Sequence, residues 1–152
     1  MQEIERKFLV DTNKWSPQGK GIAIRQGYIS DDPDRTVRVR IAGEKSFLTI
    51  KGKSTGIART EFEYEIPLED AEFLMTLVLN KTIQKTRYKE FVNGQEWEID
   101  VFEGQNAGLV MAEIELESES QKFILPEWAD IEVSGDKHYF NLYLSKKPYN
   151  TW

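Results

Sequence analysis

Residues 3–10 read Glu-Ile-Glu-Arg-Lys-Phe-Leu-Val, a run in which charged and apolar side chains largely alternate. In an extended strand, the side chains at i, i+2 and i+4 point to the same face. Glu3, Glu5 and Lys7 therefore share one face of a predicted strand, and apolar residues occupy the other. Two carboxylates beside a cation are a common arrangement for holding a divalent metal next to an anionic ligand.

The composition is that of a folded protein with a sizeable core. The 152 residues suit one domain spanning 1–152, and 39% hydrophobic with 30% charged residues exclude a disordered chain. The absence of cysteine excludes disulfides and thiolate metal sites. No apolar run approaches the roughly 20 residues that span a bilayer, and the net charge of -6 argues against a broad nucleic-acid surface. Met1 leads directly into the first strand without room for a signal peptide, so we expect a cytoplasmic protein with neither nucleic acid nor membrane as partner.

The same alternation recurs along the chain and predicts a mainly β (α+β) protein. The predicted strands lie near residues 2–10, 22–30, 35–42, 45–52, 58–67, 82–92, 95–104 and 109–118. Asn93-Gly94 between two of these runs is a strong two-residue hairpin signal, and tight turns are expected at 31–34 and 42–44. Eight strands with few helices favour an eight-stranded antiparallel β-barrel, closed or nearly closed.

Three short helices complete the predicted elements. Apolar residues at helical spacing predict a helix over 68–79, which would clad the outside of the barrel and leaves a homodimer contact open. The spacing of Ser118 to Gln121 resembles a capping box and predicts a second helix. Asp136 is expected to cap a last helix that runs to about Ser145.

The charges on the alternating faces are sorted by strand. Strands 35–42, 45–52 and 82–92 place basic residues on one face, strands 95–104 and 109–118 place acidic ones there, and strands 2–10 and 58–67 are mixed. The ordinary explanation of one such strand is a charged face that points to water. Like charges at i and i+2 repel, however, and these faces carry almost no Ser, Asn or Gln.

A polyanion bound with divalent cations would remove this repulsion on both kinds of strand. Basic strands would hold phosphoryl oxygens, and acidic strands would hold Mg²⁺ or Mn²⁺. An eight-stranded barrel is just wide enough for one small ligand, so we expect the charged faces to line its interior. The predicted phosphate-binding residues are Lys7, Arg38, Arg40, Lys51, Lys85 and Arg87, with Arg25 and Arg59 as helpers. The predicted metal-binding residues are Glu3, Glu5, Glu61, Glu63, Asp100, Glu113 and Glu115.

These motifs resemble the CYTH superfamily, the triphosphate tunnel metalloenzymes, over nearly the whole chain. The Glu3-x-Glu5-x-Lys7 motif resembles the signature of that superfamily, and the remaining motifs follow in order. They are Arg25-Gln26-Gly27-Tyr28, Arg38-x-Arg40, Thr49-x-Lys51, Arg59-x-Glu61-x-Glu63, Lys85-x-Arg87, Asp100, Glu113-x-Glu115 and Asp136-Lys137-x-Tyr139-x-Asn141. His138, the only histidine, departs from the Arg that similar proteins often carry.

The resemblance implies a tunnel that binds a small-molecule triphosphate with divalent metal, and is greatest to the compact bacterial inorganic triphosphatases. It also implies that Lys7 and Tyr28 orient or activate the attacking water, and it adds Lys85 to the catalytic candidates. A class IV adenylate cyclase, a thiamine triphosphatase and a non-catalytic polyphosphate-binding module remain alternatives. A cyclase would need a base site, for which the sequence shows no aromatic pair, and a simple anion-binding module would be weakened by the carboxylates.

Overall fold

The computed structural model of the protein describes residues 2–152. In this range the chain forms nine strands, two short α-helices and four 3-10 turns. The strands are β1 (Gln2–Val10), β2 (Ile22–Asp32), β3 (Arg35–Ala42), β4 (Lys45–Thr55), β5 (Ala58–Ile66), β6 (Leu79–Val92), β7 (Gln95–Phe102), β8 (Val110–Glu115) and β9 (Ala129–Glu132). The helices are α1 (Leu68–Leu74) and α2 (Asn141–Lys146), and the 3-10 turns are Met75–Leu77, Gly104–Asn106, Lys137–Tyr139 and Tyr149–Thr151.

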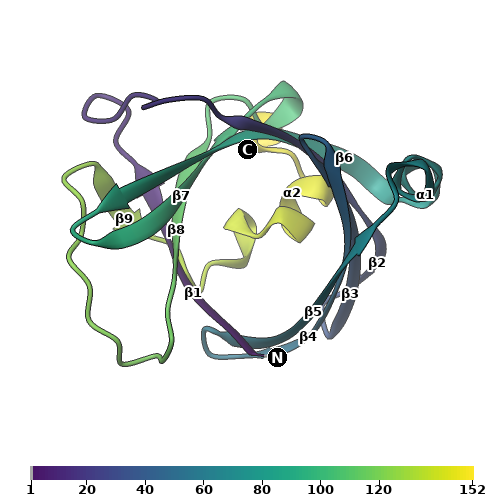
Figure 1. The fold of residues 1–152 in the computed structure, drawn as a ribbon, viewed down its shortest axis with the longest axis horizontal. Coiled ribbons are helices and arrows are strands. Elements are labelled where there is room, and N and C mark those ends of the chain that lie inside the picture. Colours follow the sequence, from purple (N-terminus) through teal and green to yellow (C-terminus); the bar gives the residue numbers. More distant parts are fainter. Residues whose placement is uncertain (1) are drawn as a thin grey trace.

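Eight of the strands described in residues 2–152 close into an antiparallel barrel (Figure 1). Their order is β5-β4-β3-β2-β6-β7-β8-β1, and β1 closes the ring by pairing with β5, with Gln2 opposite Thr60 and Ile4 opposite Ala58. The short strand β9 also pairs with β1, where Phe8 lies opposite Glu132. The predicted eight-stranded antiparallel barrel is confirmed.

Turn chemistry fixes the register of the β6–β7 hairpin. Asn93 and Gly94 have φ values of 53° and 77°, as a type I′ turn requires at both central residues. Glycine and asparagine tolerate this left-handed backbone better than other residues. Arg87 consequently lies opposite Asp100 across the two strands, which places a cation and a carboxylate on the same face of the barrel wall.

Three predicted elements differ from the observed ones. The helix predicted over 68–79 ends at Leu74 and continues as a 3-10 turn before β6 begins at Leu79. The helix predicted from Ser118 is wrong, because the Gln121 side chain instead accepts a hydrogen bond from the Glu117 backbone N–H at 2.6 Å and the segment stays irregular. Asp136 caps the 3-10 turn Lys137–Tyr139 by accepting from the His138 N–H, and α2 begins separately at Asn141.

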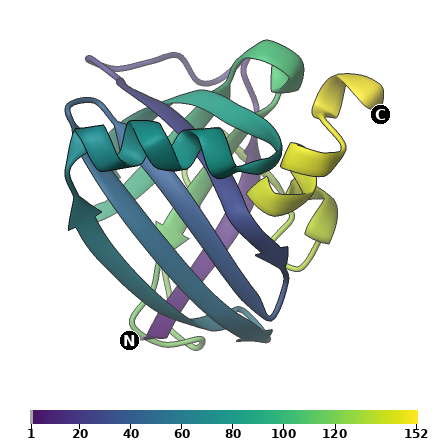
Figure 2. The ribbon, with the colours of Figure 1, turned by 90° about the vertical axis from the view of Figure 1, so that its right-hand side faces the viewer.

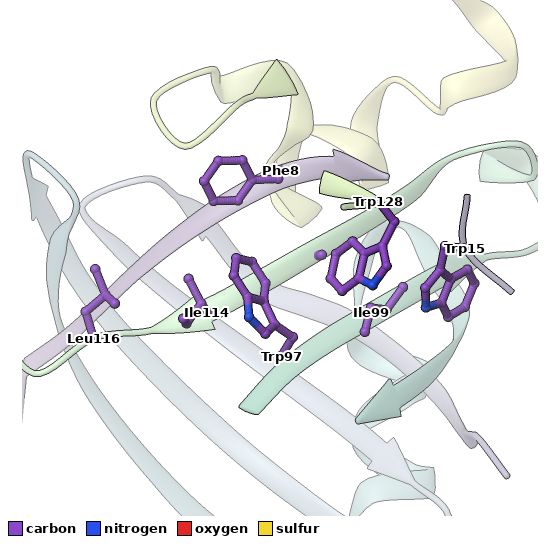
Figure 3. Close-up of a cluster of buried hydrophobic side chains, with 8 residues drawn as sticks. Phe8, Trp15, Trp97, Ile99, Ile114, Leu116 and Trp128 are labelled. Carbon is purple, nitrogen blue, oxygen red and sulfur yellow. The ribbon is translucent and has the colours of Figure 1, made fainter. Parts of the chain in front are cut away.

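The apolar faces of the strands point outward, and other parts of the chain cover some of them, whereas Phe62 and Tyr64 of β5 are exposed. Trp97 is fully buried on the outside of β7, within 5.8 Å of the Phe8 ring and 5.6 Å of the Trp128 ring between centroids. Figure 3 shows this cluster on β1, β7 and β8, with Trp128 contributed by the segment that precedes β9. On the other side of the barrel, α1 packs on β3 and β4, where Val39, Ala71 and Met75 form a small buried cluster (Figure 2).

The C-terminal segment closes one end of the barrel. Leu144 of α2 is fully buried against Ile83, Phe102 and Met111, which occupy the same strand faces as the charged residues at 85, 100 and 113. Figure 1 shows α2 lying across the ring formed by the strands. The inner surface is therefore apolar at this end and charged elsewhere. No helix within residues 2–152 is long and apolar enough to cross a membrane.

We predict that Leu144→Ala will destabilise the protein by about 2–5 kcal/mol, because it leaves a cavity in the end cluster. Urea unfolding followed by tryptophan fluorescence measures this change. Leu125→Ala is the matched control, since 51% of the Leu125 surface is exposed and its truncation is expected to cost less than about 0.5 kcal/mol. Equal effects from the two substitutions would contradict the assignment of α2 as the element that closes the barrel.

Candidate functional site

Charged side chains from seven strands meet inside the barrel. Lys7, Lys85 and Asp100 are buried, although charged groups are rarely buried without partners. The ion pairs among the predicted site residues join neighbouring strands of the β6–β7 hairpin as well as strands that are distant in the sequence. They are Lys51–Glu3 at 2.7 Å, Lys7–Glu113 at 3.9 Å, Arg38–Glu63 at 3.6 Å, Lys85–Asp100 at 2.6 Å and Arg87–Asp100 at 2.8 Å.

One wall of the interior carries more positive than negative charge. Asp100 accepts hydrogen bonds from both Lys85 and Arg87, so a single carboxylate serves two cations. Arg40 donates through Nε to the neutral amide oxygen of Gln26 at 2.7 Å. Arg38 donates to the Thr49 hydroxyl at 3.2 Å, and its Nε is buried without a partner. A buried donor without an acceptor is costly, and here it lies beside other unneutralised cations.

The pKa values of these groups reflect their burial and the charges beside them. Burial, together with the nearby Arg38 and Arg87, lowers the pKa of Arg40 to about 9. Burial lowers the pKa of Lys85 to about 7, against the opposing attraction of Asp100. Burial alone would raise the pKa of Asp100, but Arg87 and Lys85 hold it well below its usual range. An anion bound at this wall would stabilise the charged forms of the cations.

The neighbouring strands β8 and β1 carry a carboxylate pair on their inner faces. Glu5 and Glu113 share a hydrogen bond, and burial together with the Glu113 charge raises the pKa of Glu5 well above its usual value. Burial opposes ionisation of Glu113, but Lys7 and the hydrogen bond from Glu5 lower its pKa to about 2. The two pKa values are therefore shifted in opposite directions, which favours a neutral Glu5 beside an ionised Glu113. Lys7 faces this charge, and Glu113 and Glu5 raise the pKa of Lys7 although its burial opposes the rise.

The seven predicted metal-binding carboxylates do not form one cluster. Across residues 2–152, no three acidic, histidine or cysteine side chains gather closely enough to form a metal site as they stand. Asp100 is occupied by Lys85 and Arg87, and Glu63 accepts from Thr49 at 2.9 Å. Glu3 interacts with both Lys51 and Glu61, and burial raises the pKa of Glu3.

Glu5 and Glu113 are the residues that best fit a hard divalent cation. They offer neighbouring carboxylate oxygens, which Mg²⁺ and Mn²⁺ prefer, and each carboxylate shifts the pKa of the other. Glu115 lies opposite Glu5 in the β1–β8 register, and burial and the Glu3 charge raise its pKa. A pocket of about 340 Å³ reaches this side of the interior from solvent. Its lining includes Lys89, Glu98, Glu113, Glu115 and Gln121.

Arg25 does not lie in the interior, which corrects its predicted role as a phosphate-binding helper. It forms an ion pair with Glu72 of α1 at 2.7 Å on the outer surface. Residues 25 and 28 differ by an odd number, so they lie on opposite faces of β2, and the interior face is that of Gln26 and Tyr28. Arg59 is half-buried and donates to the backbone carbonyls of Gly52 and Pro33. It therefore links β5 to β4 and to the turn between β2 and β3.

Tyr28 faces the interior and is 7% exposed. Its hydroxyl lies within electrostatic range of Lys7 and Arg40. This places one candidate for orienting water beside two of the cations that are candidates for contacting substrate. The roles of Lys7, Tyr28 and Lys85 in catalysis remain predictions.

Sequence reasoning missed two neutral residues that contact the cations. Gln26 is fully buried and accepts from Arg40, and Asn141 accepts from Lys85 at 3.4 Å. The alternation of β2, which places residue 26 on the face of Tyr28, was a signal for Gln26. Asn141 belongs to the Asp136-Lys137-x-Tyr139-x-Asn141 motif, but that motif did not indicate a contact with Lys85, because the place of Asn141 depends on how the C-terminal segment enters the end of the barrel.

The comparisons with known proteins agree with this geometry. The sequence profile of the CYTH domain matches residues 1–141. The inorganic triphosphatase of Acetivibrio thermocellus is 47% identical over 152 residues, covering 99% of this chain and 97% of the relative. The inorganic triphosphatase of Nitrosomonas europaea is 39% identical over 147 residues, covering 93% and 95%. The crystal structure of the inorganic triphosphatase NE1496 superimposes with a TM-score of 0.67 at 37% identity, covering 94% and 93%.

The carboxylate pair predicts a pH-dependent gain in stability for Glu5→Gln in the absence of metal. A raised folded-state pKa stabilises the protein below the unfolded-state value, and this contribution is lost as the pH rises through the folded-state pKa. The neutral amide avoids the ionisation, so the variant should melt above wild type at pH 8, by roughly 2–4 °C for each kcal/mol of repulsion removed. At pH 5 the two should differ little.

Thermal unfolding in EDTA at the two pH values measures this difference. Glu44→Gln, at an exposed turn position, is the matched control and should show no such pH dependence. A Glu5→Gln variant that melts below wild type at pH 8 would contradict the neutral Glu5.

Proposed function

The chain belongs to the CYTH domain family, and we propose that it hydrolyses a small-molecule triphosphate with the help of a divalent metal ion, with inorganic tripolyphosphate as the preferred substrate. The observation that carries the proposal is the unneutralised positive charge of the inner wall. Arg40 has only an amide as its hydrogen-bond acceptor, and Arg38 has a buried Nε without any. A linear anion with several charged oxygens would supply the missing acceptors.

The carboxylate pair supports catalysis rather than binding alone. A site built only to bind a polyanion would be weakened by Glu5 and Glu113, which repel it. With a cation bound to them, the same residues would attract a phosphate chain. A divalent ion held by Glu5 and Glu113 would supply polarisation of a phosphoryl oxygen and a bound water of lowered pKa. The similarity of the chain to two inorganic triphosphatases supports the hydrolysis of a triphosphate. Carboxylate oxygens favour Mg²⁺ or Mn²⁺ as the metal.

The chain's own residues would act by positioning and by charge neutralisation, which dominate phosphoryl transfer. Arg38, Arg40 and Arg87 would hold the phosphoryl oxygens in line and offset their charge. Lys7 lies 3.9 Å from Glu113, at the boundary of the acidic and basic parts of the interior, where it can contact substrate and the attacking water together. Tyr28 would orient that water through its hydroxyl.

A substrate without a nucleobase fits the interior better than a nucleotide. The aromatic ring pairs found in residues 2–152 lie in the outer cluster or in the C-terminal segment, as with Trp97–Trp128 and His138–Tyr143. None of them flanks the pocket at Glu98, Glu113 and Glu115. A base entering there would meet charged side chains instead of the aromatic faces that stack on bases. This favours tripolyphosphate over ATP and the triphosphatase over a cyclase.

We predict that the protein releases phosphate from tripolyphosphate with Mg²⁺ or Mn²⁺, and that excess EDTA abolishes this activity. ATP and thiamine triphosphate should be cleaved less efficiently, because part of each molecule must remain outside the charged interior. A phosphate-release assay on the three substrates, with cyclic AMP measured in parallel, tests this. Full activity in EDTA would exclude the metal, and cyclic AMP formation with little tripolyphosphate cleavage would make the protein a cyclase.

Two substitutions should separate catalysis from binding. Lys7→Ala is expected to lower kcat by about 10²–10³, because it removes charge stabilisation that is strongest in the transition state. Arg38→Ala should chiefly raise KM, since its wall is basic and far from the carboxylate pair. Arg25→Ala, on the outer surface, is the control and should leave both constants unchanged. Pure KM effects from both interior substitutions would remove Lys7 from the catalytic residues.

A further inference from the structure

The C-terminal segment contacts two of the interior cations, Lys85 and Lys7, beyond closing the barrel. Asn141 Oδ1 accepts from Lys85 Nζ at 3.4 Å and from Gln26 Nε2 at 3.1 Å. The Tyr139 carbonyl accepts from Lys7 Nζ at 3.4 Å, and the Phe140 ring centroid lies 5.4 Å from the same Nζ. The elements that carry these contacts, β1, β2, β6 and α2, are distant in the sequence.

Gln26 and Asn141 form a chain of two amides between two cations. Gln26 Oε1 accepts from Arg40 Nε at 2.7 Å, and Gln26 Nε2 donates to Asn141 Oδ1, which also faces Lys85. Arg40 can only donate, so the carboxamide of Gln26 has one possible orientation. The amide at position 26 accepts from Arg40 and donates to Asn141 at once, which a carboxylate could not do. We call this set, Arg40, Gln26, Asn141 and Lys85, the amide relay.

Neutral acceptors have a consequence that carboxylates would not have. Asp100 holds Lys85 and Arg87 by charge, and so offsets part of the attraction that these cations have for a phosphate. An amide fixes a cation in place but leaves its full charge for the substrate. Gln26 is fully buried, where a carboxylate beside Arg40 would form an ion pair that a phosphate oxygen would have to displace.

We propose that Gln26 and Asn141 are positioning residues of the phosphate site, which hold Arg40 and Lys85 in place by hydrogen bonds that add no negative charge beside them. This inference rests on the proposed function, since it requires a triphosphate bound by these cations. It makes the C-terminal segment part of the site. Leu144 in the end cluster and the ion pair of Lys146 with Asp31 at 3.3 Å fix the segment to the barrel.

The alternative is that Asn141 only fastens the C-terminal segment. Asn141→Asp separates the two roles, because the new carboxylate keeps both acceptor contacts and gains an ion pair with Lys85. If Asn141 only fastens the segment, the Asn141→Asp variant should be at least as stable as wild type and equally active. If Asn141 is part of the amide relay, the Asn141→Asp variant should keep its stability but bind substrate at least tenfold more weakly, because the charge of the new carboxylate competes with the phosphate.

The experiment compares wild type, Asn141→Asp, Asn141→Leu and Ser145→Ala by kinetics on tripolyphosphate and by the shift in melting temperature that tripolyphosphate causes in EDTA. Ser145 is the control, since it is buried in α2 and donates only to the Leu142 carbonyl. We expect Asn141→Asp to raise KM at least tenfold and to lose most of the ligand-induced shift. Asn141→Leu should lower kcat/KM at least tenfold, and Ser145→Ala should change the melting temperature alone.

Gln26→Met tests the other half of the relay. It keeps the volume of Gln26 but removes both hydrogen bonds, and the double variant with Asn141→Leu should lose little more kcat/KM than either single variant. Wild-type KM and an unchanged ligand-induced shift in Asn141→Asp would overturn the proposal. So would a loss of kcat/KM in Ser145→Ala equal to that in Asn141→Leu. Wild type that neither cleaves nor binds tripolyphosphate would overturn the proposed function itself, and the amide relay with it.

Discussion

The placement of charge inside a closed barrel constrains almost every other part of this protein. Charged side chains that alternate with apolar ones fill the interior, so the apolar face of each strand must be buried on the outside. The segment that carries Trp128 covers Phe8 and Trp97 on one side, and α1 covers Val39 on the other. These coverings contribute the hydrophobic stabilisation that a conventional barrel obtains from its centre.

The interior buries many charged side chains, and binding of a polyanion requires that its cations are not all neutralised by carboxylates. Asp100 neutralises part of the basic wall, and protonation of Glu5 removes negative charge from the acidic part. Arg40 has the neutral amide of Gln26 as its acceptor, and Arg38 has the Thr49 hydroxyl with the Glu63 carboxylate 3.6 Å away. Complete pairing would give a more stable empty protein with little affinity for a polyanion, so the remaining electrostatic strain is what a ligand can relieve.

Much of the barrel was predictable because the alternation of charged and apolar residues along a strand is a local property of the chain. Strand boundaries and the Asn93-Gly94 turn follow from neighbouring residues alone. The errors arise where the outcome depends on distant parts: β9 has four residues and forms only because β1 offers a free edge. Arg25 was predicted to help bind phosphate, although the alternation of side chains along β2 places it on the face opposite Tyr28. Asn141 enters the site through the packing of Leu144, which no local pattern encodes.

The division of the interior into acidic and basic parts also couples its two expected ligands. A cation at Glu5 and Glu113 would displace the proton of Glu5 and reduce the repulsion that these carboxylates exert on a phosphate chain. A phosphate chain at Arg38 and Arg40 would in turn increase the attraction for the cation. Each ligand must raise the affinity for the other by the same factor, because the coupling free energy is reciprocal. The barrel brings the two half-sites within the reach of Lys7, which lies against Glu113 and faces the interior, so the residue proposed for catalysis lies where both ligands would meet.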